Sequence, residues 1–196
     1  MDGSPVHISP EIQEELRCLE ESVINTLKRA SEYGNVVIIT NAEQGWVELS
    51  AGRFLPKVVP LLSYVRIVSA RTTYEPMYPN SPLDWKIAAF SQEVQNNFEV
   101  FSASGEMRSL VSFGDSIHER DAVHRVASMM ESTHTKSIKF VERPSVEQLR
   151  RQVELVHNCF DYICNYSGDL DLMLTIQLLA NGGVAAPGAA TTGANP

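Results

Sequence analysis

The sequence predicts an α/β protein in which a mainly parallel, Rossmann-like sheet lies between helices. Short β-branched runs alternate along the chain with long amphipathic stretches. The runs lack polar alternation, which is typical of strands that are covered on both faces. Strands and helices that alternate in this way form a sheet layered by helices. With 196 residues, 43% of them hydrophobic, the chain can bury the core of one ordinary domain.

The first third of the chain predicts two buried strands, each preceded by helical sequence. Ser9 suits the N-cap of an amphipathic helix that is expected to end at Gly34. The runs "NVVIIT" (35–40) and "VRIVSA" (65–70) follow the pattern of buried strands. Between them we expect helical pieces, broken at Gly52 and near two prolines.

The rest of the chain continues the alternation up to a low-complexity tail. Residues 98–104 and 108–113 flank Gly105 and are expected to form a hairpin. The remaining predictions are helices at 83–96, 119–133 and 145–166 and a strand at 135–142. Residues 1–181 are therefore interpreted as one domain. Residues 182–196 have no charge, aromatic residue or periodicity, so we expect a disordered tail there.

The bulk composition excludes several classes of function. A net charge of −8 and a pI near 5.1, without a run of Lys or Arg, argue against a nucleic-acid or anionic-membrane surface. No run reaches the ~20 apolar residues that span a bilayer, and the start does not resemble a signal peptide. The three cysteines lack CxxC spacing, so we expect buried, reduced thiols and a cytoplasmic location.

Small polar or acidic residues follow three of the predicted strands. They are Thr40 and Asn41, then Ser69 to Arg71, then Gly114 and Asp115. Ligands of open α/β sheets collect at the carboxyl ends of strands, so these residues are expected to converge. Each alone also fits a residue that only caps the following helix. Arg71 is a candidate ligand contact because a guanidinium suits phosphate or carboxylate.

The ordered segments "VVIITN", "DWKIAAF" and "VSFGDSIHERDA" resemble the second, third and fourth motifs of the haloacid dehalogenase-like (HAD-like) superfamily. Most members of that family are Mg²⁺-dependent phosphohydrolases. The resemblance implies that Thr40, with Asn41 beside it, and Lys86 contact a phosphoryl group, and that Asp115 and Glu119 hold Mg²⁺. The chemistry is consistent, since a phosphoryl group in transit needs a metal, an ammonium and a hydroxyl donor around one point.

The family's first motif is missing from this sequence. In the family, that motif is a strand ending in Asp-x-Asp, which supplies the nucleophile and lies between the strands of the second and fourth motifs. Asp2 has no strand before it, so it cannot fill this role. Asp169 and Asp171 form an Asp-x-Asp, but no apolar strand precedes them and we expect a solvated turn. Either the strand is encoded upstream, or the sheet has closed without it.

Three hypotheses for function follow. The leading one is a HAD-like domain with a remnant phosphate and Mg²⁺ site that does not hydrolyse phosphate esters and binds Mg²⁺ weakly. Its role would be binding or regulation, toward a small phosphorylated ligand or a protein partner. The alternative is a Mg²⁺-dependent phosphohydrolase represented by an incomplete chain. The third is an unrelated α/β interaction domain. His118, beside Asp115, is expected to be a surface histidine rather than a zinc ligand.

Overall fold

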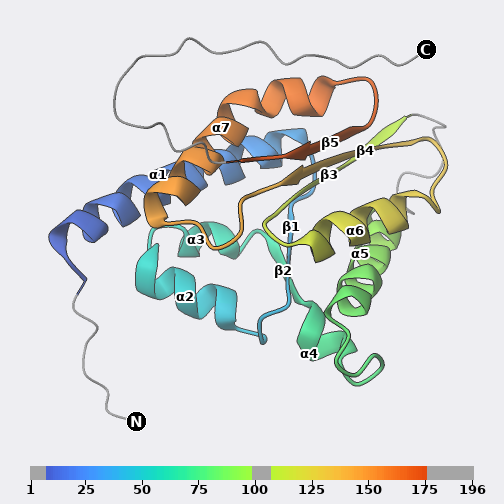
Figure 1. The fold of residues 1–196 in the computed structure, drawn as a ribbon, viewed down its shortest axis with the longest axis horizontal. Coiled ribbons are helices and arrows are strands. Elements are labelled where there is room, and N and C mark those ends of the chain that lie inside the picture. The colour runs from blue at the N-terminus through green and yellow to red at the C-terminus, as the bar shows by residue number, and fades with distance from the viewer. Residues whose placement is uncertain (1–7, 99–106, 176–196) are drawn as a thin grey trace.

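The computed structural model describes residues 8–98 and 107–175, and within them the chain is an α/β protein with small parallel sheets between helices (Figure 1). The elements, in chain order, are α1 (Pro10–Tyr33), β1 (Val37–Thr40), α2 (Trp46–Phe54), α3 (Val59–Leu62), β2 (Arg66–Ser69), α4 (Ala70–Tyr74), α5 (Pro82–Phe98), β3 (Arg108–Gly114), α6 (Ile117–Ala127), β4 (Thr133–Lys139), α7 (Val146–Asn165) and β5 (Leu170–Met173).

The described strands form two separate parallel sheets. β1 pairs with β2, with Val37 opposite Arg66. In the second sheet the order is β3-β4-β5, and Arg108 of β3 lies opposite Thr133 of β4. All three pairings are parallel, as the apolar strand sequences predict. The Rossmann-like class is compatible with this arrangement, but β1 and β3 are not paired with each other.

Helices cover both faces of these sheets with apolar side chains. On one face, α7 packs Val156 and Phe160 against Ile138 of β4, and α1 lies beside α7 (Figure 1). On the other face, α5 and α6 pack together, and Val123 of α6 belongs to a cluster that includes Leu110 of β3. α2 and α3 extend the first layer over the β1-β2 sheet. Apolar clusters therefore lie on both sides of β1 and β3. The edge strand β5 is different, since Leu172 and Met173 are exposed.

Serine caps set the starts of three long helices close to the predicted positions. The side chain of Ser9 accepts a hydrogen bond from the Ile12 amide at 3.4 Å at the start of α1. Ser116 and Ser145 form capping boxes with Glu119 and Gln148 at the starts of α6 and α7. These signals are local in sequence, which is why the helix starts were predictable.

Several expectations about elements were wrong. α2 continues through Gly52 instead of breaking there, and α6 ends at Ala127, short of the predicted residue 133. The partner of β3 is β4, in parallel, while most of the first arm of the expected hairpin lies outside the described residues. Of the cysteines expected to be buried, Cys159 is exposed and the other two are half-buried; all three are free thiols.

The Asp-x-Asp of residues 169–171 does not form a turn, although the Asp169 side chain is exposed to solvent as expected. Asp171 lies inside β5, opposite Ser137 of β4, and Asp169 directly precedes the strand. The Asp169 Oδ1 atom accepts a hydrogen bond from the Thr135 amide at 2.7 Å. Both carboxylates therefore have structural roles at the edge of the second sheet.

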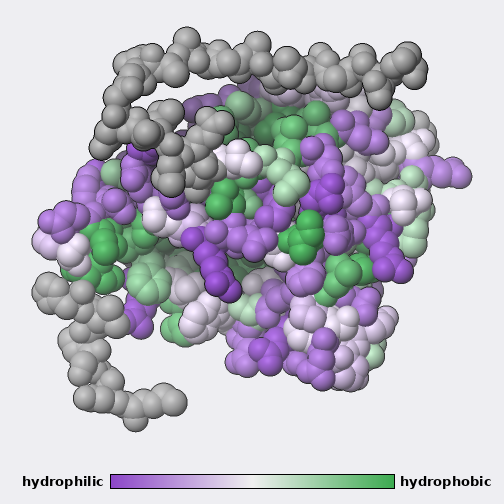
Figure 2. Space-filling view, in the orientation of Figure 1, coloured by the Kyte–Doolittle hydropathy of each residue, from purple (hydrophilic) through white to green (hydrophobic). Residues whose placement is uncertain are grey.

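On the face seen in Figure 2, hydrophobic residues form separate small patches among hydrophilic ones. None of the described helices has the length and apolar character that crossing a membrane requires. The predicted tail, residues 182–196, lies outside the described residues.

Candidate functional site

A buried lysine lies between the carboxyl ends of β1 and β3. Lys86, in the second turn of α5, is 2% exposed. Its ammonium donates a hydrogen bond to the Ile39 carbonyl at 2.6 Å and lies 2.6 Å from Oε1 of Glu119. Ile39 belongs to β1, and Glu119 is in the first turn of α6, directly after β3. One side chain thus links the ends of two strands from different sheets.

The carboxylate of Glu119 has two structural roles. Its Oε2 atom accepts a hydrogen bond from the Ser116 amide at 2.9 Å, completing the capping box of α6, while Oε1 faces Lys86. The side chain lies directly over Gly114, where an added Cβ would be 2.8 Å from Glu119 Cγ and 2.9 Å from Glu119 Cβ. A residue without a side chain is therefore required where β3 ends.

Thr40 and Asn41 follow β1 next to the Lys86 contact. The Thr40 hydroxyl accepts a hydrogen bond from the Ala42 amide at 3.0 Å. Thr40 also lines a hollow of about 30 Å³, room for about one water, together with Glu43 and Glu48. Asn41 donates to the Pro82 carbonyl at 3.2 Å, and its buried Oδ1 has no hydrogen-bond partner among the described residues.

The other two predicted site residues are exposed. Arg71, in α4, forms an ion pair with Glu75 at 3.0 Å, one helical turn along. Asp115 directly follows β3 and is exposed to solvent beside the α6 N-terminus. The candidates from three strand ends therefore include one buried ion pair, one exposed carboxylate and one exposed, paired guanidinium.

The available oxygens decide what the site can bind. Both carboxylate oxygens of Glu119 are engaged, so this residue can ligate a cation only by giving up a contact. No cluster of three or more His, Cys, Asp or Glu suited to a metal exists within residues 8–98 and 107–175. Asp115 and the Oδ1 atom of Asn41 are hard oxygen donors of the kind that Mg²⁺ prefers. A cation held by so few protein ligands would keep several waters.

Asp171, the second acid of the only Asp-x-Asp, is held by basic side chains of α6. Arg120 donates from Nε to Asp171 Oδ1 at 2.9 Å and makes a second, shorter contact with Oδ2. The hydrogen bond from Arg120 lowers the pKa of the Asp171 carboxyl, and His124 lowers it further. A carboxylate fixed in a fork of this kind stabilises β5 against α6 and is poorly placed to act as a nucleophile.

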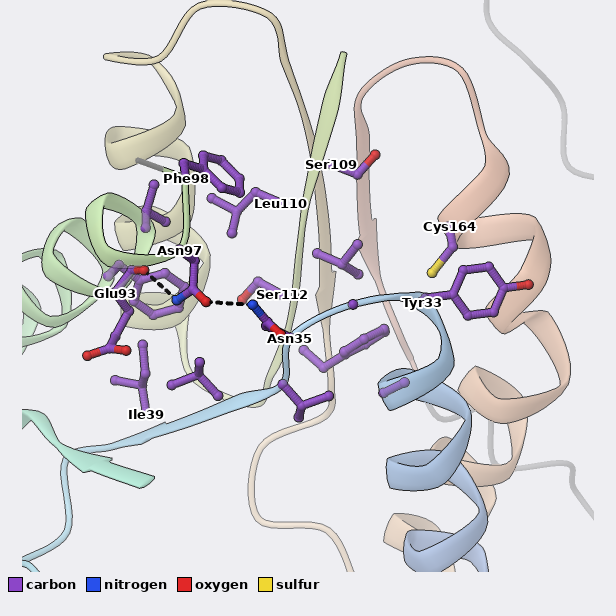
Figure 3. A pocket seen from close by; sticks show the side chains of 18 of the residues that line it. Tyr33, Asn35, Ile39, Glu93, Asn97, Phe98, Ser109, Leu110, Ser112 and Cys164 are labelled. Carbon is purple, nitrogen blue, oxygen red and sulfur yellow. Dashed lines mark hydrogen bonds between the residues drawn. The ribbon is translucent and has the colours of Figure 1, made fainter. Parts of the chain in front are cut away.

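The feature that sequence reasoning missed is a cavity of about 650 Å³ between the two sheets (Figure 3). Its walls include residues of β1 and β3 and apolar side chains of α1, α5 and α7. The sequence carried no signal for it, because the pairing of β1 and β3 on one side only, among the described strands, is a tertiary feature. Glu119 lines the cavity and links it to the Lys86 contact.

The fold and the strand-end residues define an α/β domain with a polar site at the carboxyl ends of parallel strands. No family model matches the chain, and no curated protein or solved structure is significantly similar to it.

Proposed function

We propose that the chain is a HAD-like domain with a remnant phosphate and Mg²⁺ site, which binds a ligand without hydrolysing phosphate esters. The order of the motifs supports this proposal, because Thr40, Lys86 and Asp115 each stand at or near the carboxyl end of a strand. Lys86 touches the residue before Thr40, and Glu119, its ion-pair partner, bonds the amide directly after Asp115. Groups brought together from separate strands in this way suit recognition of a phosphoryl group.

The single observation that favours binding over turnover is the ion pair between Lys86 and Glu119. In a phosphoryl-transfer site the ammonium has to neutralise the nucleophile and the transferring group. Here its charge is already neutralised by a carboxylate at 2.6 Å. A covalent route also needs a carboxylate in line with phosphorus, and both acids of the only Asp-x-Asp are used elsewhere.

The ligand class that fits is a small phosphorylated compound, or a protein partner that presents such a group. Mg²⁺ would bind weakly through Asp115, with Glu119 joining only if its contact with Lys86 opens. Asn41 and Arg71 would contribute polar contacts at the rim. We place this role in the cytoplasm, and the three free thiols are consistent with a reducing compartment.

Hydrolysis of an aryl phosphate tests the absence of turnover. We expect the purified chain, with Mg²⁺, to release no more product than the Asp115→Asn variant, since electrostatic groups alone accelerate the attack of water by only ~10³ to 10⁴. Robust Mg²⁺-dependent activity that disappears in Asp115→Asn would overturn the proposal. Asp121→Asn, which changes an exposed carboxylate on α6, the helix that follows Asp115, is the matched control.

Binding itself is tested by titrating inorganic phosphate in the presence of Mg²⁺ and following phosphorus resonances. We expect line broadening that depends on Mg²⁺ and is lost in Asp115→Asn but retained in Asp121→Asn. Broadening that is the same in all three proteins, or absent from the unmodified one, would contradict a phosphate site at this edge.

The second candidate is a Mg²⁺-dependent phosphohydrolase of which this sequence is an incomplete copy. The separation of β1 from β3 favours it, because the sheet has not closed without the family's first strand. The test is a longer chain that carries an apolar strand ending in Asp-x-Asp ahead of Pro10. Mg²⁺-dependent turnover that appears only in the longer chain would support this candidate, and continued inactivity would favour the binding role.

A further inference from the structure

The helix α2 carries large apolar side chains on the side that faces away from the core. Toward the core, its residues Val47 and Ala51 pack with side chains of α1, β1 and β2. On the outer side, Trp46 is 56% exposed and Leu49 is 66% exposed. A helix at the surface of a domain ordinarily presents polar residues to solvent. Exposed apolar residues that gather on one helix face mark an interaction surface.

The position of α2 leaves its outer face open to another molecule. The helix lies at the lower left of the molecule in Figure 1, beside α3. The structure describes the chain without a gap from residue 8 to residue 98, so α2 has described residues on both sides in the sequence. In the described part of the chain, no element covers Trp46 or Leu49, as their exposure shows.

Four side chains make up the outer face of α2. They are Trp46, Leu49, Ser50 and Arg53. At about 3.6 residues per turn, Trp46 and Arg53 lie nearly in line along the helix, almost two turns apart. Leu49 and Ser50 lie between them, one on each side of that line. The face therefore holds an aromatic ring at one end, a cation at the other, and one apolar and one small side chain in the middle.

The polar groups of this face have only local contacts. The Ser50 hydroxyl donates to the Val47 carbonyl at 3.1 Å, within α2. The Arg53 guanidinium lies over the ring of the adjacent Phe54, with 5.4 Å between the guanidinium carbon and the ring centroid. It forms no ion pair with another described residue. Since a guanidinium has five N–H donors, Arg53 can take a further partner without losing this contact.

The outer face is symmetric about the middle of α2. Trp46 precedes the point between Leu49 and Ser50 by as many residues as Arg53 follows it. A twofold axis through this point, perpendicular to the helix, would place Arg53 of a second copy against Trp46, and Leu49 of that copy against Ser50. A guanidinium against an indole ring is a favourable cation-π contact, and the small serine leaves room for leucine. The first turn of α2 holds Glu48 and its last turn Arg53, so antiparallel helices also bring opposite charges closer.

We propose that this chain forms a homodimer in which two α2 helices pack antiparallel across a twofold axis. A second copy is the partner because the face carries both halves of each contact: the aromatic ring and the cation, the leucine and the serine. Stable interfaces bury roughly 1,200–2,000 Å², whereas a helix of nine residues is only ~14 Å long. The dimer is therefore weak and forms at high protein concentration. The proposal does not depend on the phosphate site, because no residue of that site belongs to this face.

Sedimentation equilibrium of the full chain tests the dimer, from about 10 µM to about 1 mM, where weak complexes form. We expect the mean mass to rise from 21.7 kDa toward twice that value. Leu49→Asp places a charge at the centre of the contact and should remain monomeric throughout. Met129→Asp, which changes a methionine that is 68% exposed after α6, is the matched control and should dimerise like the unmodified chain. Circular dichroism verifies that both variants are folded.

Exchange of the two end residues of the face tests the antiparallel register. Trp46→Arg sets two guanidinium groups against each other, so it should weaken the dimer by about tenfold or more. The double variant, Trp46→Arg with Arg53→Trp, places the ring and the cation in exchanged positions and restores the cation-π contact. We therefore expect it to recover most of the affinity that the single variant loses.

A chain that is monomeric at every concentration would overturn the proposal. So would a dimer that Leu49→Asp leaves intact, that Met129→Asp weakens equally, or that the double variant fails to restore. Binding to vesicles of neutral phosphatidylcholine that requires Leu49, without a dimer, would make the face a membrane contact and also contradict the proposal. The phosphate titration depends on Asp115, which is not on α2, so the failure of one proposal is distinguishable from the failure of the other.

Discussion

Lys86 and Glu119 form an ion pair that bridges two sheets, between which the described strands make no pairing. The side chain of Lys86 is 2% exposed and that of Glu119 is 16% exposed, so the pair is largely removed from water. Breaking such a pair leaves an uncompensated buried charge, which costs far more than breaking an exposed pair. The pair is therefore the first target for mutagenesis.

Glu119→Gln should destabilise the protein by about 3 kcal/mol or more, because Lys86 loses its counter-charge inside the protein. Glutamine retains the capping hydrogen bond to Ser116, so the substitution isolates the charge. Urea denaturation measures the change. Glu75→Gln, which breaks the exposed pair with Arg71, is the control and should cost less than about 1 kcal/mol. Equal losses of unfolding free energy from the two substitutions would show that the buried pair stabilises the protein no more than the exposed pair does.

Gly114→Ala should destabilise the protein by about 1 to 3 kcal/mol, a typical cost of overpacking. The new methyl group would collide with Cβ and Cγ of Glu119, which lie near the helix backbone and cannot swing away easily. Gly52→Ala is the control, because an added Cβ there meets nothing within 4 Å. Thermal unfolding followed by circular dichroism compares the two variants. A Gly114→Ala variant as stable as Gly52→Ala would contradict the close approach of Glu119 to β3.

Acidification should weaken the attachment of β5 to α6. Arg120 lowers the pKa of Asp171 in the folded protein, so the carboxylate contributes stability that is present above its unfolded pKa, near 3.9. That contribution is lost as the pH falls through the lower folded value. Its size is about 1 kcal/mol or less, since the side chains are partly exposed.

Asp171→Asn removes this contribution, so its unfolding free energy should fall less than that of the unmodified protein between pH 6 and pH 3. Urea titrations across that range measure the difference. Asp121→Asn serves as the control, since its carboxylate lies 3.7 Å from Arg120 and makes no fork. Identical pH profiles for the unmodified protein and Asp171→Asn would argue against the pairing with Arg120.

Mg²⁺ should raise the unfolding temperature only at millimolar concentrations. The described residues offer no cluster of three metal-ligating side chains, and Glu119 is engaged with Lys86. Stabilisation by a ligand grows as RT ln(1 + [L]/Kd), so a weak site has little effect at micromolar cation. Calorimetric titration measures the affinity for Mg²⁺, and the Asp115→Asn variant, which lacks the proposed ligand, is the comparison. Binding in the low-micromolar range would contradict a remnant site.

The parts of the fold that follow from neighbouring residues were predictable. Ser9 and Ser145 begin long helices where expected, because a cap bonds amides within three residues. The β-branched run at 37–40 forms a strand because its side chains suit a pleated, covered surface. The strand ends at Thr40 and Gly114 were found for the same local reason.

The parts that depend on distant partners were not predictable. Asp171 is tolerated inside a strand because Arg120, 51 residues away, forms a fork with its carboxylate. From the neighbouring residues alone, the segment around Asp169 and Asp171 predicts a turn, because no apolar strand precedes it. The expected hairpin of residues 98–104 and 108–113 was wrong for the same reason, because the partner of β3 is β4, which follows α6 in the sequence.

The sequence by itself determined the α/β class of the fold, the strands β1 to β4 with the long helices between them, and the polar residues at the strand ends, but not β5. Only the tertiary structure decided that Lys86 is paired with Glu119, and that an apolar cavity separates β1 from β3. The reason is physical: caps, turns and periodicity act over a few residues, whereas ion pairing and burial depend on which side chains meet after the chain has folded.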